Sequence, residues 1–512
     1  MTVTSRHEYL VRNRNLERVL DWAPLCLVVL LVATEQPFFG NFDDGLWLRL
    51  SSSGDPRDLL EGTTVPGLSQ VENGTSRFLS QLIIFPLYWA SSLPPAHLGA
   101  LVLFALNTLL VLGCFAVFLD AAGKIFFPVM PEGSLRLVGY ALLWPFAIDL
   151  LFFPSLQEKI VVLGVGLLLH IFRFSFDRPA KAPIQVVLAV IAPLLFLTKT
   201  HVVMFAPVLM LGVVTLGVQK VRLEDRHPKP SKLVVLQFHK PRLLQAIFWL
   251  AVIVIASGSV LAMAILGEYS RSTRGSPDVS KLLSDWRFLL TLVLFFAHQC
   301  TSFALSKDSK IETYMFSDRL LSAIFGAAIY LPVLLSFSIW EIRNYYLSVL
   351  APAFAMTINL FLTALVRASH LRRVRVEEVV RGLVGLLCIS WVLFRLPMGY
   401  GATSSFRDFL TLQVRGSDDV VYVMCGEAQN HFNYYASLPG YGGPSFEWVG
   451  TDGQYVPHEE GLPFEVLADE MFCPLDRFPV PADVESAELL WTSSKRNSYQ
   501  LWGLSARASK DN

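Results

Sequence analysis

The sequence has little charge. Of its 512 residues, 16% are Asp, Glu, Lys or Arg and 53% are hydrophobic, whereas a soluble globular protein carries about 25% charged residues. This shortage excludes an ordinary water-soluble domain. The formal net charge is zero, so only the distribution of charge along the chain is informative. We expect membrane lipids, and no nucleic acid, among the partners.

The sequence also lacks the spacing of a metal site, because it has no CxxC pair and no His-rich run. We therefore expect no metal and no cofactor, although a divalent cation would suit a pyrophosphate leaving group. Cys425 and Cys473 lie in the polar C-terminal tail and can pair if the tail is in an oxidising compartment. The other four cysteines lie in apolar runs, where a free cysteine behaves as a small hydrophobic residue: Cys26, Cys114, Cys300 and Cys388.

Long apolar runs recur between about residue 20 and residue 396. A run of about 18 residues or more is typical of a membrane-spanning helix. The sequence therefore predicts an all-α polytopic membrane protein with about 11 transmembrane helices. The expected spans are 20–38, 97–119, 137–153, 156–172, 183–199, 201–218, 244–267, 286–306, 320–338, 344–366 and 378–396.

Basic segments set the orientation, since loops rich in Lys and Arg stay in the cytoplasm. Eleven crossings bring all four basic segments to one side, with the N-terminus inside and the C-terminal tail outside. These segments are the N-terminus with Arg6, Arg12, Arg14 and Arg18, and the loops around 173–181, 220–242 and 367–375.

One further run, 78–92, must then not cross. Its unbroken apolar part is short and contains Pro86, and Tyr88 and Trp89 suit the headgroup region. We expect a helix that lies on the outer face or dips into it. The competing scheme makes 78–92 a span instead of 20–38, which would put residues 35–77 in the cytoplasm. That segment has no Lys and three Arg against seven acidic residues, which favours the outer side.

The tail, 397–512, is a different kind of sequence. It is polar, with Gly-Gly, Pro and short apolar runs such as DDVVYVMC, SAELLWTS and YQLWGL, which indicate a small α/β or β-rich domain. The expected organisation is a cytoplasmic N-terminus over 1–19, a transmembrane domain over 20–396 whose first outer loop is 39–96, and a C-terminal extracytoplasmic domain over 397–512.

Acids and bases gather at the outer ends of the expected spans. Cations at such depth can hold a phosphate, and a carboxylate can accept a proton from a nucleophile. These residues are Asp43, Asp44, Arg77, Glu158, Lys159, Lys199, His201, Glu341 and Arg343.

Each of these residues also has a structural interpretation. Lys and Arg at helix ends usually extend toward headgroups, and an Asp pair before a Gly, such as Asp43 and Asp44, can cap a turn. Lys199 is the stronger functional candidate, because the turn between its two spans is minimal. His170 and His298 fit packing histidines better than ligands.

This order of features resembles the GT-C superfamily of polytopic glycosyltransferases, in particular the branch of protein O-mannosyltransferases and lipid A aminoarabinose transferases. FDDG at 42–45 is similar to that family's acidic motif after the first span, and 46–60 and 78–92 would be its juxtamembrane helices. Arg77 stands where the family has a basic residue before its last juxtamembrane helix. The remaining matches are Glu158, Thr198-Lys199 with Thr200 where Gly is usual, and RNYYLSVLAP from Arg343. The resemblance covers about residues 20–366 and leaves out the tail.

The resemblance implies an inverting transfer of sugar from a polyprenyl-phosphate donor to a glycan, lipid or protein acceptor outside the membrane, here a bacterial inner membrane. Asp44 or Asp43 would be the general base. Glu158 would position the sugar or the cations, and Glu341 would line the substrate site beside Arg343. The leaving phosphate would be neutralised by Arg77, Lys199 and Arg343, with Lys159 and His201 as second choices.

Three other functions compete with this interpretation. A lipid-linked oligosaccharide polymerase or ligase would put basic residues in a long late outer loop, whereas the outer loops after residue 100 are short until 397. A transporter or flippase would need polar groups near the membrane midplane and inverted repeats. A membrane scaffold without catalytic activity would not need ordered acids and cations at one face.

Overall fold

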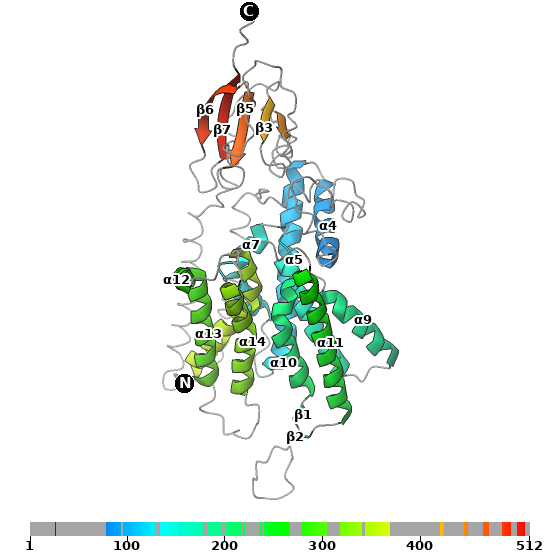
Figure 1. Cartoon of the computed structure of the whole chain (residues 1–512). Helices are drawn as coiled ribbons and strands as arrows, with labels where there is room; N and C mark the ends of the chain where they lie inside the picture. Colours follow the sequence, from blue (N-terminus) through cyan, green and yellow to red (C-terminus); the bar gives the residue numbers. More distant parts are fainter. Residues whose placement is uncertain are drawn as a thin grey trace, which may run out of the picture.

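A computed structural model shows a mostly helical chain with a small sheet near its C-terminus (Figure 1). The structure describes residues 26, 78–93, 96–127, 134–152, 154, 156–177, 182–196, 200–217, 219–220, 236–237, 240–266, 279–304, 318–339, 344–368, 420–423, 445–448, 464–469, 484–492 and 499–506. The expected spans 20–38 and 378–396 lie almost wholly outside these ranges.

Helix α5 (Ala96–Phe126) is the longest in the described part of the chain, and α4 (Phe78–Ser92) lies beside it (Figure 1). Its 31 residues make α5 about 46 Å long, which exceeds the apolar thickness of a bilayer, about 30 Å. Ile84 and Tyr88 of α4 are buried. The run 78–92 is therefore a helix, as expected, and its 15 residues fall short of the length of about 20 that a crossing needs. That it does not cross remains a prediction.

The run expected to form one span over 137–153 is not one continuous helix. It forms α6 (Ser134–Leu142) and α7 (Ala147–Phe152), separated by a turn around Pro145. Proline has no N–H to donate to the preceding turn of a helix. The neighbouring Trp144 is buried, and its indole N–H donates to the carbonyl of Leu347, 2.8 Å away, so this turn is packed into the bundle.

Helix α8 (Glu158–Asp177) packs closely against α5. A Cβ on Gly166 would lie 2.8 Å from the backbone of Phe118, so only glycine permits this approach of the two helices. Helix α8 corresponds to the span expected over 156–172.

Helix α9 (Ala182–Phe196) is followed by the 3-10 helix η3 (Thr200–Phe205) and by α10 (Ala206–Gly217). The axis turns by 115° between α9 and the segment from His201 to Gly217, and Figure 1 shows α9 inclined against its neighbours. These elements occupy the runs expected as spans over 183–199 and 201–218. With 15 residues, α9 is about 22 Å long, so it crosses an apolar layer incompletely on its own.

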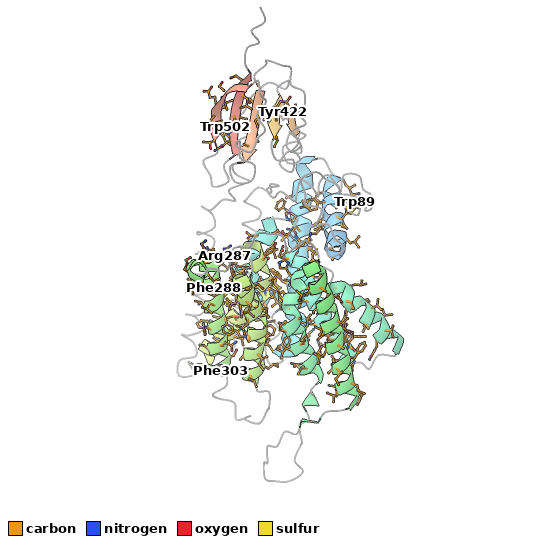
Figure 2. All side chains as sticks on the ribbon, in the orientation of Figure 1. Trp89, Arg287, Phe288, Phe303, Tyr422 and Trp502 are labelled. Carbon is orange, nitrogen blue, oxygen red and sulfur yellow. The ribbon has the colours of Figure 1, made fainter. Side chains whose placement is uncertain are left out.

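The remaining helices are α11 (Lys240–Leu266), α12 (Val279–Ser284), α13 (Trp286–Ala304), α14 (Asp318–Ile339), the 3-10 helix η5 (Asn344–Leu350) and α15 (Ala351–Ala368). In Figure 2, Arg287 and Phe288 mark one end of α13 and Phe303 marks the other. Of the described helices, α5, α8, α11 and α14 are long and apolar enough to cross a membrane, and α9 with η3 and α10 makes a fifth if it is one bent span. The full set of eleven spans remains a prediction.

A five-stranded sheet forms from the tail, in the order β4-β3-β5-β7-β6. Strand β3 is parallel to β4 and β5, and β7 is antiparallel to β5 and β6. The apolar runs noted in the sequence form β3, β6 and β7. The bounds are β3 (Val420–Val423), β4 (Ser445–Trp448), β5 (Phe464–Asp469), β6 (Val484–Thr492) and β7 (Tyr499–Ala506).

The sheet lies beyond the end of the helices at which α4 and α7 are found (Figure 1). The short antiparallel pair β1 (Gln219–Lys220) and β2 (Leu236–Gln237) lies at the opposite end. Strands β1 and β2 are thus separated from the five-stranded sheet by the length of the helices. Which end faces the cytoplasm remains a prediction.

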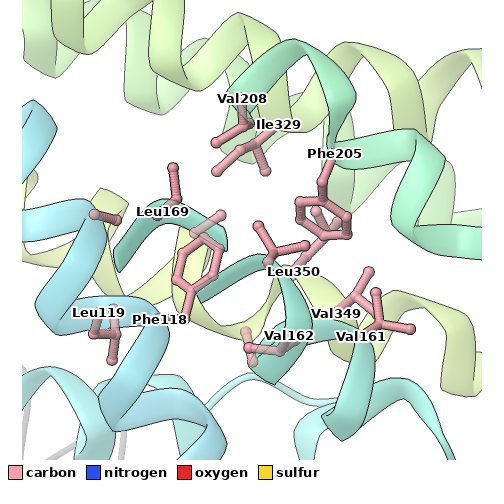
Figure 3. Close-up of a cluster of buried hydrophobic side chains, with 14 of the residues drawn as sticks. Phe118, Leu119, Val161, Val162, Leu169, Phe205, Val208, Ile329, Val349 and Leu350 are labelled. Carbon is pink, nitrogen blue, oxygen red and sulfur yellow. The ribbon is translucent and has the colours of Figure 1, made fainter. Parts of the chain in front are cut away.

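A continuous apolar core fills the space between α5, α8, η3, α10, α14 and η5. Figure 3 shows its middle, where Phe118 and Leu119 of α5 face side chains from five other elements. The labelled partners are Val161, Val162 and Leu169 of α8, Phe205 of η3, Val208 of α10, Ile329 of α14, and Val349 and Leu350 of η5. This core fixes the start of α8 and both 3-10 helices relative to one another.

Candidate functional site

The start of α8 carries two charged residues that are fully buried. Glu158 and Lys159 are both 0% exposed. The backbone N–H groups of Ile160 and Val161 donate to the carbonyl of Gln157, at 2.9 and 3.2 Å, which closes the first turn. The positive end of the helix dipole favours a carboxylate in this turn, and Glu158 stands there.

Lys159 holds the turn that joins α7 to α8. Its Nζ donates to the carbonyl of Pro154 at 2.5 Å. Because the ammonium is buried and donates to a backbone carbonyl, it stabilises the turn. A contact of Lys159 with a lipid phosphate, the second-choice role expected from the sequence, remains a prediction.

Asn107 of α5 forms hydrogen bonds to the end of α7, just before the same turn. Its Nδ2 donates to the carbonyls of Leu150 and Leu151, at 2.8 and 3.0 Å, and so caps the end of α7, where helix carbonyls lack intrahelical partners. The sequence analysis missed Asn107. A sequence feature that could have indicated it is a lone amide side chain inside an apolar run. Burying an unbonded polar group there would be costly, so a hydrogen-bond partner is expected.

The two 3-10 helices meet beside this turn. His201 of η3 lies against Tyr346 of η5, with ring centroids 4.5 Å apart at 43°. Helix η5 packs against α7 and α8, and η3 packs against α8 and α14. Three of the sequence motifs therefore lead into elements that pack against one another: QEK at 157–159, TKTH at 198–201 and RNYY at 343–346.

Three of the candidate residues lie in the described part of the chain: Glu158, Lys159 and His201. The other six lie outside it: Asp43, Asp44, Arg77, Lys199, Glu341 and Arg343. Two of these are tied to the site by connectivity, since Lys199 directly precedes the first residue of η3 and Arg343 directly precedes the first residue of η5. The positions of Asp43, Asp44, Arg77 and Glu341 relative to the site remain predictions.

A second charged feature, which the sequence analysis also missed, stands at the start of α13. The Arg287 guanidinium donates to Asp285 through Nε at 2.8 Å and through Nη2 at 2.5 Å, and its backbone N–H donates to Oδ1 at 2.9 Å. Hydrogen bonding from Arg287 holds the pKa of Asp285 below its usual value. Asp285 thereby caps α13 in the manner of an N-terminal carboxylate.

An aromatic contact joins this capped end to the turn before α7. Trp286 is 57% exposed and stacks on the buried ring of Phe146, with centroids 5.5 Å apart and planes 20° apart. The start of α13 therefore lies at the same end of the helices as α7. An exposed tryptophan at a helix end suits the headgroup region.

Within the described ranges, no group of three or more His, Cys, Asp or Glu side chains could hold a metal ion. Cys26, Cys114 and Cys300 are free thiols, while Cys425 and Cys473 lie outside the described residues. Comparison with protein-family models, with curated proteins and with solved structures finds no match to this chain.

Proposed function

We propose that this chain is a membrane glycosyltransferase that moves a sugar from a polyprenyl-phosphate donor to an acceptor hydroxyl. The reaction would take place at the end of the helices where α8, η3 and η5 begin. The observation that carries the proposal is the contact of His201 in η3 with Tyr346 in η5, together with the packing of both 3-10 helices against α8. Each of these three elements follows or contains a charged motif.

The two cations that lead into the 3-10 helices would act on the leaving group. Lys199 and Arg343 each adjoin an element that packs against the start of α8. Two positive charges that approach from different elements can neutralise one phosphate, and an arginine can bind it through two parallel hydrogen bonds. We assign to Lys199, Arg343 and Arg77 the binding of the polyprenyl phosphate.

The buried pair at the start of α8 has a different task. Lys159 donates to the Pro154 carbonyl and fixes the turn, and Glu158 is the buried acid beside it. A carboxylate in this place would keep nearby cationic side chains charged and oriented. We therefore assign Glu158 to positioning the cations and Lys159 to holding the turn, in place of direct contact with the lipid phosphate.

The transfer itself would be a single displacement. Asp44, or its neighbour Asp43, takes the proton from the acceptor hydroxyl, and the acceptor oxygen forms a bond to the anomeric carbon. The bond from that carbon to the phosphate oxygen breaks, and its electron pair leaves on the polyprenyl phosphate. Attack opposite the leaving group inverts the anomeric centre. The sheet beyond this end of the helices would contribute to binding the acceptor.

The arrangement gives less support to a transporter or flippase. Such a protein needs polar groups open to a substrate near the midplane. Among the described residues, the deep polar cluster around His298 is bonded within itself and to backbone carbonyls. The charged motifs instead converge at one end of the bundle.

A transfer assay tests the proposal. Membranes with the wild-type chain, supplied with labelled polyprenyl-phosphate sugars, should label an acceptor, and Asp44→Asn and Lys199→Ala should lower the rate by about a hundredfold or more. The matched control is Lys220→Ala, a charge removal in β1 at the opposite end, which should leave the rate unchanged. Full activity in Asp43→Asn, Asp44→Asn and Lys199→Ala, at normal expression, would contradict the proposed site.

The sidedness is tested separately by labelling single cysteines in sealed cells. A cysteine at position 44 should react with an impermeant reagent from outside, and one at position 229 should react only after the cells are opened. Labelling of both positions from the same side would reject the orientation.

A further inference from the structure

Three helices meet at a buried cluster of polar side chains that the proposed chemistry does not use. His298 of α13, Ser322 and Tyr330 of α14, and Thr357 of α15 are each at most 3% exposed. His298 lies 12 residues after the first residue of α13, about 18 Å along the helix, and so lies deep in the bundle. Polar groups at such depth are costly unless they are bonded.

The donor and the acceptor can be assigned for each hydrogen bond of His298. His298 Nε2 lies 2.9 Å from the Ser322 carbonyl, which can only accept, so Nε2 carries a hydrogen. The described residues include no ion pair between His298 and a carboxylate, and a charged imidazole would be costly at this depth. The ring is therefore neutral, and Nδ1 accepts from the hydroxyl of Thr357 at 2.8 Å.

Thr357 joins the third helix to this chain of bonds. Its Oγ1 also lies 2.8 Å from the hydroxyl of Tyr330, which donates to it once Thr357 has donated to His298. The carbonyl of Ala353, one turn earlier in α15, is an alternative acceptor at 2.9 Å. The interhelical bond therefore has to compete with a bond inside α15, and the register of α15 decides which forms.

The backbone of α14 is shaped to receive the imidazole. A Cβ on Gly326 would lie 2.3 Å from Cδ2 of His298, so the ring occupies the space that any other side chain would need. Further bonds hold α13 to α14 on either side: Gln299 Nε2 donates to the Ala323 carbonyl at 2.9 Å, and the hydroxyls of Ser302 and Ser322 are 2.7 Å apart.

This three-helix unit contacts both 3-10 helices of the candidate site. Helix α15 continues directly from η5, and Thr357 lies six residues after its start, about 9 Å along the axis. Helix α14 contacts η3, where the Ser336 hydroxyl lies 3.8 Å from the sulfur of Met204. A shift of α15 against α14 would move η5 against η3.

We propose that His298, held as the neutral Nε2-protonated tautomer between Ser322 and Thr357, is a positioning residue that sets the register of α15 and so keeps η5 against η3. The consequence for sugar transfer rests on the proposed function, whereas the consequence for the contact between η3 and η5 does not. The two are therefore tested apart.

The contact between η3 and η5 can be measured without any assay of activity. The double variant His201→Cys/Tyr346→Cys, in a full-length chain whose natural cysteines are replaced by alanine, should form a rapid intramolecular cross-link with a short bis-maleimide. Adding Thr357→Val removes the hydroxyl but keeps the shape of the side chain. Because this loses a buried interhelical hydrogen bond and frees the register of α15, the cross-linking rate should fall about threefold or more.

Two matched controls separate register from a general loss of stability. Thr301→Val removes a hydroxyl that bonds only to carbonyls of its own helix and should leave the cross-linking rate unchanged. Gly326→Ala, which displaces the imidazole, should act like Thr357→Val. Gly258→Ala, at a position with open space around it, should not. Equal rates in Thr357→Val, Gly326→Ala and both controls would overturn the inference.

The tautomer gives an independent test on the unmodified chain. Nitrogen NMR of ¹⁵N-histidine-labelled protein in nanodiscs should show, among the signals of the ten histidines, a neutral ring protonated at Nε2 that is missing in His298→Gln. If the signal that His298→Gln removes at neutral pH came from an Nδ1-protonated ring or from an imidazolium, the proposal would be contradicted. Loss of cross-linking in a chain with no transferase activity would leave this inference standing and remove the proposed function.

Discussion

The ring of His201 in η3 lies 4.5 Å from the ring of Tyr346 in η5, centroid to centroid. This contact joins two segments that are far apart in sequence, and each begins directly after a candidate cation, Lys199 or Arg343. The contact holds together the two elements that follow these cations, and both elements pack against α8.

Replacing Tyr346 should separate the need for its ring from the need for its hydroxyl. Tyr346→Ala removes the aromatic partner of His201, and an aromatic pair is worth about 0.5–1.5 kcal/mol beyond its buried area. We expect transfer to fall about tenfold, while Tyr346→Phe keeps most of the activity. Equal rates in the two variants, measured at equal amounts of folded protein, would argue against the ring contact.

Asn107→Leu should destabilise the turn between α7 and α8. The variant leaves the carbonyls of Leu150 and Leu151 without their buried donor, and the expected cost is about 1–3 kcal/mol. The measurement is the denaturant midpoint in detergent micelles. Thr108→Val is the matched control, since that hydroxyl bonds only to the Phe104 carbonyl in its own helix. A midpoint for Asn107→Leu no lower than the control's would show that the capping bonds contribute little.

Gly166→Ala should force α8 away from α5. The added methyl would lie 2.8 Å from the backbone of Phe118, and relieving such a contact costs about 1–3 kcal/mol. Gly113→Ala is the control, because that position has open space around it and alanine favours a helix by about 1 kcal/mol. Thermal unfolding should therefore separate the two variants in opposite directions, and equal melting temperatures would reject the close packing of the two helices.

The Asp285–Arg287 pair should make stability depend on pH. The pKa of Asp285 is lower in the folded chain than in the unfolded chain, so the folded state favours the carboxylate. This contribution is fully present above the unfolded pKa and is lost as the pH falls through the folded pKa. Asp285→Asn should lower the melting temperature at neutral pH, and the gap to wild type should close in acid. A gap that stays constant down to about pH 3 would contradict this linkage.

Much of the fold follows from patterns that are local in sequence. Long apolar runs located α5, α8, α11 and α14, and the short apolar runs DDVVYVMC, SAELLWTS and YQLWGL indicated a small α/β or β-rich domain, in which they form β3, β6 and β7. The turn at Pro145 was not predicted, because hydropathy averages over a break that one proline and a buried Trp144 produce. The same averaging does not show the 115° turn between α9 and the segment from His201 to Gly217, and whether 183–199 is a full span remains a prediction.

The site could be predicted only in part for a related reason. Charges at helix ends point to Glu158, Lys199 and Arg343, but sequence position alone cannot show that η3 and η5 touch. Lys159 was expected only as a second-choice phosphate ligand, and its hydrogen bond to the Pro154 carbonyl could not be predicted because it depends on the fold of the turn. His298 was interpreted as a packing residue, and its network involves partners on two other helices that no local pattern predicts.

The most direct test of the account is the fate of the donor. Purified protein in nanodiscs, given a labelled polyprenyl-phosphate sugar and an acceptor, should release polyprenyl phosphate and glycosylated acceptor in equal amounts, with inversion at the anomeric carbon. Asp44→Asn should abolish both products while Lys220→Ala releases them at the wild-type rate. An intact donor after incubation with folded wild-type protein, across a panel of polyprenyl-phosphate sugars, would contradict the account.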